Sequence, residues 1–325
     1  MTGPAGRQPM QIALTGATGF VGAHTTHELI RRGHKVRLLV RDAGRLSTEL
    51  AEGAQVVEGA LDDAAALTQL TGGADAVIHV AGAIKAASFD AFMAANAHGA
   101  ARLADAAARA GVKRFVHVSS LAAREPQLSG YCASKAAGEV VVRTAADASP
   151  DMELVIIRPP AVYGPGDRAT LPLVRQLSNR VALMTGTASQ RLSLIHAADL
   201  ASALVAAAEG AGRAGQIYEV DDGTPGGYSH RAMAEAAAHA TGRVARVAHL
   251  PRALLALAGA GARGWMSATG RAVILSPGKV RELYHADWVC TGEKFEHAGP
   301  WRARYRFAEG FADTLEWYRT NGWLP

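Results

Sequence analysis

The stretch QIALTGATGFVG (residues 11–22) decides the fold. Its first residues are mostly apolar, as in a buried strand, and an amphipathic helix is predicted from residue 21 to 32. Three glycines separate the two elements with the spacing GxxGxxG. Glycine lets a backbone turn tightly near a large anion, and a helix start offers free N–H groups to phosphate. The stretch therefore predicts a dinucleotide phosphate site made by Gly16, Thr18, Gly19, Phe20, Val21 and Gly22, with a turn that binds nothing as the alternative.

Outward from this stretch, short apolar segments alternate with helical ones. Strands are predicted at 36–40, 55–60, 75–82, 114–120 and 153–160, and helices at 63–73, 96–110 and 134–146. Because the strands are apolar nearly throughout and alternate with helices, we predict an α/β protein with a doubly wound parallel sheet, the Rossmann fold. We expect a dinucleotide-binding core of residues 11–168, rejoined by 190–222. Residues 169–189 and 223–325 would form a smaller, helix-rich substrate lobe.

Composition limits the functional classes. Of 325 residues, 49% are hydrophobic and 19% charged, which is typical of a globular protein. The net charge is +5, but no block of like charges occurs, so no nucleic-acid partner is expected. Cys132 and Cys290 lie in no CxxC or metal motif, and we expect neither a disulfide nor a metal site. Because no apolar stretch of signal-peptide type precedes residue 11, we expect a cytoplasmic protein.

The segment ALLALAGAGA (253–262) is the most lipid-like part of the chain. It is too short to span a bilayer, which needs about 20 apolar residues, so we expect no membrane span. A buried or lobe-capping helix is the first interpretation. The alternatives are an apolar lid and a weak contact with a membrane surface.

Cofactor choice depends on the end of the second predicted strand, VRLLVRD (36–42). In a dinucleotide fold, an acid at this point binds the ribose 2′-hydroxyl of NAD, whereas an arginine suits the 2′-phosphate of NADP. Arg41 lies at the tip, Asp42 follows it, and Arg45 is close enough to assist. Because a guanidinium matches a phosphate well, we predict NADP, with NAD as the alternative if Asp42 binds the ribose.

A tyrosine and a lysine lie four positions apart in YCASK (131–135). Residues with this spacing share one face of a helix. An ammonium group beside a phenol favours the phenolate and lowers its pKa toward neutrality, where acid–base catalysis is most effective. Taken alone, Tyr131 and Lys135 could equally belong to an ordinary helix surface.

Several motifs together resemble one family, the extended short-chain dehydrogenase/reductases. The resemblance covers about residues 11–220 and rests on the order and spacing of its motifs. They are TGATGFVG (15–22), HVAG (79–82), Asn96 before a helix, HVSS (117–120), YCASK (131–135) and RPPAVYGPGD (158–167).

The resemblance implies roles for individual residues. Tyr131 would exchange a proton with the substrate oxygen, and Lys135 would bind the nicotinamide ribose and lower the pKa of Tyr131. Ser120, with Ser119 as the alternative, would donate a hydrogen bond to the substrate carbonyl, and Asn96 would support the site. Further residues expected beside the cofactor are Leu61, Ala81, Gly82, Ser119, Pro159 and Val162.

The chain departs from the family pattern at three points. Ala60 stands where the family often has an aspartate that contacts adenine, and Asp62 or Asp63 is a candidate replacement. The family usually has two acids before a late helix, whereas this chain has only Asp199, which we expect as that helix's N-cap. The loop between Ser120 and Tyr131 is also shorter than in most nucleotide-sugar enzymes of the family.

Three functions fit these residues. The first is an NADPH-dependent carbonyl reductase, or the reverse alcohol dehydrogenase, of a small organic substrate. The second is a nucleotide-sugar epimerase or dehydratase with tightly bound NAD, in which Arg191 would lie near the diphosphate; a dehydratase would have only Glu125 as a further acid. The third is a non-catalytic NADP-binding protein. A homodimer through helices 96–110 and 134–146 is also expected as an option.

Overall fold

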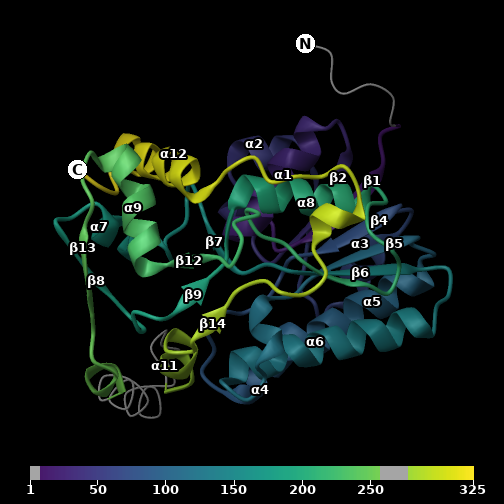
Figure 1. Cartoon of the computed structure of the whole chain (residues 1–325). Coiled ribbons are helices and arrows are strands. Elements are labelled where there is room, and N and C mark those ends of the chain that lie inside the picture. The colour runs from purple at the N-terminus through teal and green to yellow at the C-terminus, as the bar shows by residue number, and fades with distance from the viewer. Residues whose placement is uncertain (1–7, 257–276) are drawn as a thin grey trace.

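The computed structural model describes residues 8–256 and 277–325. The lipid-like segment 253–262 therefore lies mostly outside the described residues. Figure 1 shows a layered α/β body that contains the N-terminal half of the chain, and a lobe beside it that contains much of the C-terminal half.

A seven-stranded sheet forms the centre of the α/β body. Its order is β11-β6-β5-β4-β1-β2-β3, and every neighbouring pair is parallel. This confirms the predicted doubly wound parallel sheet. The strands are β1 (Gln11–Thr15), β2 (Lys35–Val40), β3 (Gln55–Glu58), β4 (Ala76–His79), β5 (Arg114–Val118), β6 (Glu153–Arg158) and β11 (Ile217–Glu219).

Helices cover both faces of this sheet (Figure 1), which is why its strands are apolar on both sides. One face carries α1 (Phe20–Arg31) and α8 (Ala197–Ala208), which pack against each other. The other carries α3 (Ala64–Thr71), α5 (Gly99–Arg109) and α6 (Gly130–Asp147). Shorter elements of this body are α2 (Thr48–Glu52), α4 (Phe89–Met93), and the single turns η1 (Ala43–Arg45), η2 (Ala94–His98) and η3 (Leu121–Arg124).

The C-terminal lobe has its own apolar core, in which α9 packs against α12. Its helices are α7 (Leu171–Leu177), α9 (His230–Thr241), α11 (Pro277–Leu283) and α12 (Phe307–Thr320). Its small sheets pair β8 (Val181–Met184) with β13 (Arg246–His249), and β9 (Arg191–Leu192) with β12 (Tyr228–Ser229) and β14 (Asp287–Trp288). The remaining elements are the parallel pair β7 (Ala161–Tyr163) with β10 (Leu194–His196), and the turn η4 (Phe295–Ala298).

Two helices start three or more residues away from their predicted positions, and capping explains the first. The helix predicted from residue 134 begins at Gly130, because the Ser129 hydroxyl accepts a hydrogen bond from the N–H of Cys132. Tyr131 therefore lies in the first turn of α6. The helix predicted from residue 96 is preceded by a π-helical turn, η2, which contains Asn96. Such turns are rare and often occur at functional sites.

Candidate active site

The glycine loop connects β1 to α1, as the sequence predicts. Gly16 has a φ of +86°, and a methyl carbon placed there would lie 2.7 Å from the amide nitrogen of Ala81. A methyl carbon at Gly22 would lie 2.0 Å from the carbonyl oxygen of Gly16. At Gly19, the N-cap of α1, the nearest atom would be 3.2 Å away. Gly16 and Gly22 are thus required by packing, whereas Gly19 leaves room in front of the helix start, a cradle that fits a pyrophosphate.

Two arginines and one aspartate lie at the tip of β2, and the aspartate carboxylate already accepts a hydrogen bond from the backbone. Asp42 accepts a hydrogen bond from the N–H of Gly44 at 3.0 Å and so caps the turn η1. Arg41 and Arg45 are exposed, and neither side chain has a hydrogen-bond or ion-pair partner within residues 8–256 and 277–325. Two guanidinium groups are therefore available at the position expected for a 2′-phosphate.

Ser120 and Tyr131 are brought together from the end of β5 and the start of α6. The Ser120 hydroxyl lies near enough to the Tyr131 phenol to affect its pKa, and Ser120 also caps the turn η3 through the N–H of Ala122 at 3.2 Å. Burial raises the pKa of Tyr131 to about 12, although the Ser120 hydroxyl favours ionisation. This differs from the expectation that Lys135 lowers the pKa of this tyrosine. The phenol is held protonated at neutral pH.

Lys135 lies one helical turn after Tyr131 and is buried. Its ammonium group donates to the carbonyl oxygen of Val118, the last residue of β5, at 2.7 Å. This hydrogen bond engages the ammonium with a backbone carbonyl. Burial lowers the pKa of Lys135 to about 8, although the nearby Glu139 favours the charged form.

Ser119 does not share the position of Ser120. Its hydroxyl donates to the buried carboxylate of Glu139, which also receives two bonds from Arg158, at 2.7 and 2.6 Å. The three residues join β5, α6 and β6. Ser119 is thus occupied in a structural network, which leaves Ser120 as the hydroxyl next to Tyr131.

Asn96 holds two parts of the site together. Its amide nitrogen donates to the carbonyl oxygen of Ala83 at 3.0 Å and to the hydroxyl of Ser134 at 2.9 Å, while its oxygen accepts from the N–H of Ala83 at 2.7 Å. The loop after β4 is therefore fastened to the helix that carries Tyr131. A methyl carbon at Gly82 would lie only 2.9 Å from the Asn96 side-chain oxygen, so this position has room only for glycine.

The other expected cofactor neighbours lie at the ends of the predicted elements. The N–H of Ala81 donates to the Thr15 hydroxyl at 3.3 Å. Pro159 accepts at its carbonyl from the N–H of Leu121 at 2.8 Å, and Val162 lies in β7. Leu61 lies against Gly99 on α5, where an added methyl carbon would be 2.8 Å from its side chain.

Two buried histidines lie beneath the lysine, and sequence reasoning gave them no role. His79 and His117 are register partners on β4 and β5, and their rings stack with centroids 5.4 Å apart. His79 shares a hydrogen bond with the hydroxyl of Thr15 at 2.7 Å. Burial lowers the pKa of His79 to about 3 and that of His117 well below its usual range, and the Lys135 charge acts in the same direction. Both rings are therefore uncharged, and they line the buried side of the site. A histidine at the same position of two similar motifs, HVAG and HVSS, was the sequence signal that could have identified them.

Contacts in the structure bear on two of the three departures from the family pattern. Asp63 caps α3 through the N–H of Ala66 at 3.0 Å, so its carboxylate is not a ready replacement at adenine. Asp199 is not the N-cap of α8, a position that His196 occupies. Its buried carboxylate accepts from the N–H groups of Arg304 and Tyr305 at 3.0 and 2.9 Å and fastens the C-terminal segment to the body.

Arg191 is also engaged. Its guanidinium donates to the carbonyl oxygens of Gly226 and Gly227 at 2.6 and 2.8 Å. The Arg191 side chain therefore stabilises the turn before β12.

The lobe reaches the site through α11. Glu282 is buried, accepts from the Ser129 hydroxyl at 2.5 Å and pairs with Lys279 at 2.8 Å. Its carboxylate is near enough to Tyr131 to contribute to that residue's raised pKa. On the other side, the rings of Phe92 and Tyr131 have centroids 6.2 Å apart.

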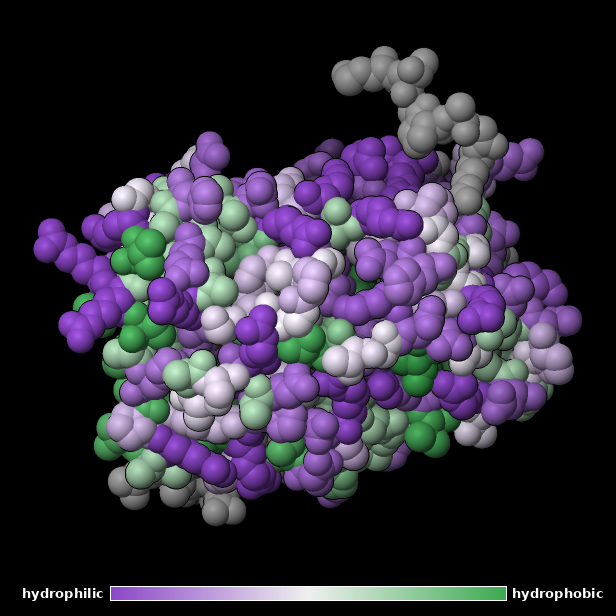
Figure 2. Space-filling view, in the orientation of Figure 1, coloured by the Kyte–Doolittle hydropathy of each residue, from purple (hydrophilic) through white to green (hydrophobic). Residues whose placement is uncertain are grey.

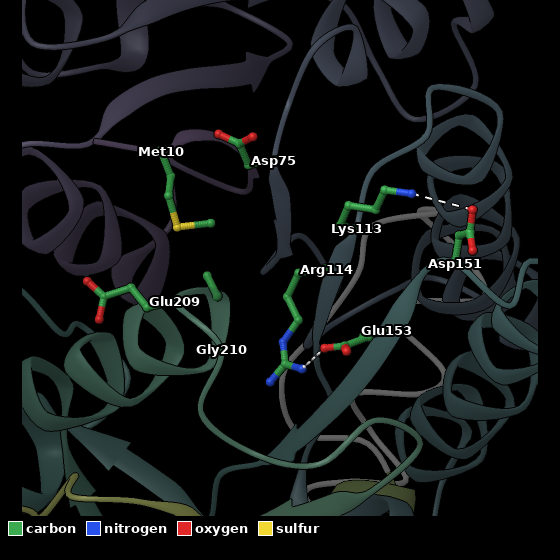
Figure 3. A pocket seen from close by; sticks show the side chains of 9 residues that line it. Met10, Asp75, Lys113, Arg114, Asp151, Glu153, Glu209 and Gly210 are labelled. Atoms are coloured by element: carbon green, nitrogen blue, oxygen red, sulfur yellow. Dashed lines mark hydrogen bonds and ion pairs between the residues drawn. The ribbon is translucent and has the colours of Figure 1, made fainter. Parts of the chain in front are cut away.

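A hollow at the opposite end of the sheet holds no part of this site. Figure 3 shows it at the amino ends of the strands, where Lys113 faces Asp151 and Arg114 faces Glu153. These ion pairs have N–O distances of 3.4 and 2.6 Å. The charges compensate one another, and none of the predicted site residues is present.

Within residues 8–256 and 277–325, every helix is too short or too polar to cross a bilayer. Within the same ranges, no three histidine, cysteine or acidic side chains gather in a way that would hold a metal ion.

Comparisons with known proteins agree with this geometry. The profile of the NAD dependent epimerase/dehydratase family matches residues 12–221. A ceramide reductase of Caulobacter vibrioides is 39% identical over 314 residues, which are 97% of this chain and 96% of that protein. A 4-hydroxy-2-methyl-3-oxo-4-farnesyl-3,4-dihydroquinoline-1-oxide ketoreductase of Stigmatella aurantiaca is 31% identical over 66% of this chain and 69% of its own length. Among solved structures, MoeE5 in complex with UDP-glucuronic acid and NAD has a TM-score of 0.73 and 22% identity, covering 96% of this chain and 99% of its own.

Proposed function

The chain belongs to the NAD-dependent epimerase/dehydratase family of enzymes, and we propose that it is an NADPH-dependent reductase that converts a ketone on a ceramide-like lipid into a hydroxyl group. The observation that carries the proposal is the similarity to a ceramide reductase over 97% of the chain. That similarity continues beyond the family match at residue 221 into the lobe where substrate choice is expected.

The contacts described above support the expected cofactor-binding residues. The open space at Gly19 before α1 fits the pyrophosphate, and the exposed Arg41 and Arg45 fit a 2′-phosphate. Lys135 would bind the nicotinamide ribose. When bound, the reduced nicotinamide supplies the hydride that is added to the carbonyl carbon.

The matching proton would come from Tyr131. Reduction of a ketone needs one proton at the oxygen for each hydride added at carbon, and a phenol with a pKa of about 12 still carries its proton at neutral pH. The Ser120 hydroxyl lies near this phenol and would orient the carbonyl oxygen toward it. A site that keeps its acid protonated is suited to reduction rather than to alcohol oxidation, which needs the phenolate.

The surroundings of Tyr131 suit an apolar substrate. Phe89 and Phe92 both lie against Gly130, the residue before the tyrosine, and Phe89 is 53% exposed. Ile84, in the loop after β4, is 69% exposed. Aliphatic and aromatic groups beside the proton donor would favour an acyl or alkyl chain by removing it from water.

A nucleotide-sugar epimerase or dehydratase with tightly bound NAD is the competing function. It would need a cation for the diphosphate, and the residue expected for that task, Arg191, donates to the carbonyl oxygens of Gly226 and Gly227. A dehydratase would also need a second acid at the site, but Glu125 accepts a hydrogen bond from Gln127 in a loop. Both contacts favour the reductase.

The cofactor retained on purification separates the two functions. The proposal predicts a protein that is isolated largely without cofactor, takes up NADPH, and consumes it in the presence of a keto-ceramide dispersed in detergent. Isolation with stoichiometric NAD, identified by mass spectrometry, together with no NADPH consumption would contradict it.

A further inference from the structure

The sheet formed by β8 and β13 exposes aliphatic side chains on its outer face. Successive side chains on a strand point to opposite faces. In β8, Ala182 and Met184 point inward and are buried, whereas Val181 and Leu183 point outward and are 51% and 44% exposed. A strand with one face toward solvent would ordinarily place polar residues on that outer face.

Arginines are interspersed with these aliphatic residues. Arg246 is the register partner of Val181 and is exposed beside it. Its N–H donates to the carbonyl oxygen of Arg180 at 2.9 Å, so that Arg180 lies at the same end of the sheet. Val244, which precedes β13, is 58% exposed.

The mixture of exposed arginine and aliphatic side chains continues past the ends of the strands. The N–H of Leu250 donates to the carbonyl oxygen of Met184 at 2.9 Å and extends the pairing, and the following Arg252 and Leu254 are exposed. Figure 2 shows green aliphatic and purple polar side chains mixed along the edge of the molecule where Figure 1 places β8 and β13. We call this surface the ribbon face and define it as Arg180, Val181, Leu183, Val244, Arg246 and Leu254.

The positive charge of the ribbon face is not compensated nearby. Neither Arg180 nor Arg246 forms an ion pair with an acidic side chain within residues 8–256 and 277–325. The sequence itself has no aspartate or glutamate between residues 168 and 198 or between 236 and 281. A partner for this face therefore has to be both anionic and able to accept aliphatic side chains.

A second copy of the chain fits poorly as that partner. In a twofold interface each residue meets the same surface patch on the other subunit, so arginines would be brought against arginines. An anionic bilayer has both required properties, because its phosphates lie directly above the acyl chains. Aliphatic side chains enter this boundary while arginine heads stay with the phosphates.

We propose that the ribbon face docks the protein onto the surface of an anionic phospholipid bilayer. The inference goes beyond the proposed reaction, since its evidence is the pattern of charge and exposure on β8 and β13. It would place the enzyme where a ceramide-like substrate resides. Each arginine near such a surface is worth about a fivefold gain in partition, and the attraction weakens with salt.

Vesicle sedimentation tests the proposal with the full chain and no substrate. The protein is expected to sediment with vesicles of phosphatidylglycerol and phosphatidylcholine at low salt, much less with phosphatidylcholine alone, and less again at high salt. Failure to sediment with the anionic vesicles at low salt would overturn it.

Variants locate the contact. Arg180→Glu with Arg246→Glu should lower the partition coefficient more than about tenfold, and Val181→Ser with Leu183→Ser should lower it as well. Arg213→Glu, at an exposed arginine in the loop before β11, is the matched control and should remain close to the parent. Thermal melting and NADPH affinity check that each variant is folded.

The outcomes separate this inference from the proposed function. Equal vesicle binding by the parent and both double variants would overturn the docking face. So would dimerisation of the parent in ultracentrifugation that the same variants abolish, because the face would then be a self-association surface. Vesicle binding with no ketone reduction would reject the proposed reaction and leave the docking face standing.

Discussion

The ammonium group of Lys135 donates a hydrogen bond to the carbonyl oxygen of Val118, with 2.7 Å between the two heavy atoms. This contact fixes the lysine of α6 to the carboxyl end of β5, one residue before Ser119. Because the ammonium is buried there, its pKa is lowered to about 8, within the range that activity measurements reach.

The pH profile follows from this value. Ammonium groups are charged below their pKa, so the Lys135 charge is present at neutral pH and lost as pH rises through about 8. Tyr131 keeps its proton throughout this range, because its pKa is raised to about 12. We expect kcat/KM for ketone reduction to be constant below about pH 7 and to fall as pH rises through about 8. In Lys135→Met the residual activity should lose this fall. A parent rate that rises through the same range would contradict the assignment.

Tyr131→Phe removes the phenol hydroxyl and with it the transferable proton. We expect kcat to fall by about 10²- to 10⁴-fold, while the dissociation constant for NADPH stays within a few-fold of the parent value. Tyr163→Phe is the matched control. Its hydroxyl is buried without a hydrogen-bond partner in the described ranges, so its removal should leave turnover intact and not reduce stability. Near-parental activity in Tyr131→Phe on the physiological substrate would refute its role as proton donor.

Two glycine substitutions separate binding from packing in the phosphate loop. Gly19→Val should abolish dinucleotide binding with little loss of thermal stability, because the space before α1 is largely open. Gly22→Ala should lower the melting temperature, because its methyl carbon would lie 2.0 Å from the Gly16 carbonyl oxygen. Calorimetric titration and melting curves give both quantities. Unchanged NADPH affinity in Gly19→Val would show that the pyrophosphate binds elsewhere.

Arg41 should determine the preference for NADPH. Charge-assisted hydrogen bonds to a phosphate contribute about 1.5–3 kcal/mol each, so Arg41→Ala should cost about one to two decades of NADPH affinity and leave NADH nearly unaffected. Asp42→Asn keeps an acceptor for the Gly44 N–H while removing a negative charge, and should shift preference further toward NADPH. Dissociation constants for both cofactors decide this. Tighter binding of NADH by the parent, with no change in Arg41→Ala, would make Asp42 the selecting residue.

The sequence predicted the parts of this protein that depend on local chemistry. The glycines between β1 and α1 and the parallel sheet were predictable because strand pattern, turn and helix start are all local. The order of the family motifs added the expected pairing of Tyr131 with Ser120.

Contacts between distant segments were not predictable. Glu282 reaches Ser129 from α11, and Asp199 binds the backbone of Arg304 and Tyr305 instead of capping its own helix. The sequence also favoured a lowered pKa for Tyr131, because spacing places Lys135 on the same helix face. It could not reveal that the ammonium group bonds to Val118 or that burial acts more strongly on the phenol.

Net reduction of a lipid ketone by the protein can be followed by isotope transfer from the cofactor. NADPH carrying deuterium at the transferable position of the nicotinamide would be incubated with a keto-ceramide and either the parent or Tyr131→Phe, and the lipid product analysed by mass spectrometry. We expect one deuterium in the hydroxylated lipid with the parent and almost no product with the variant. Absence of deuterated product with the parent, together with conversion of a UDP-sugar to its epimer without net use of NADPH, would contradict it.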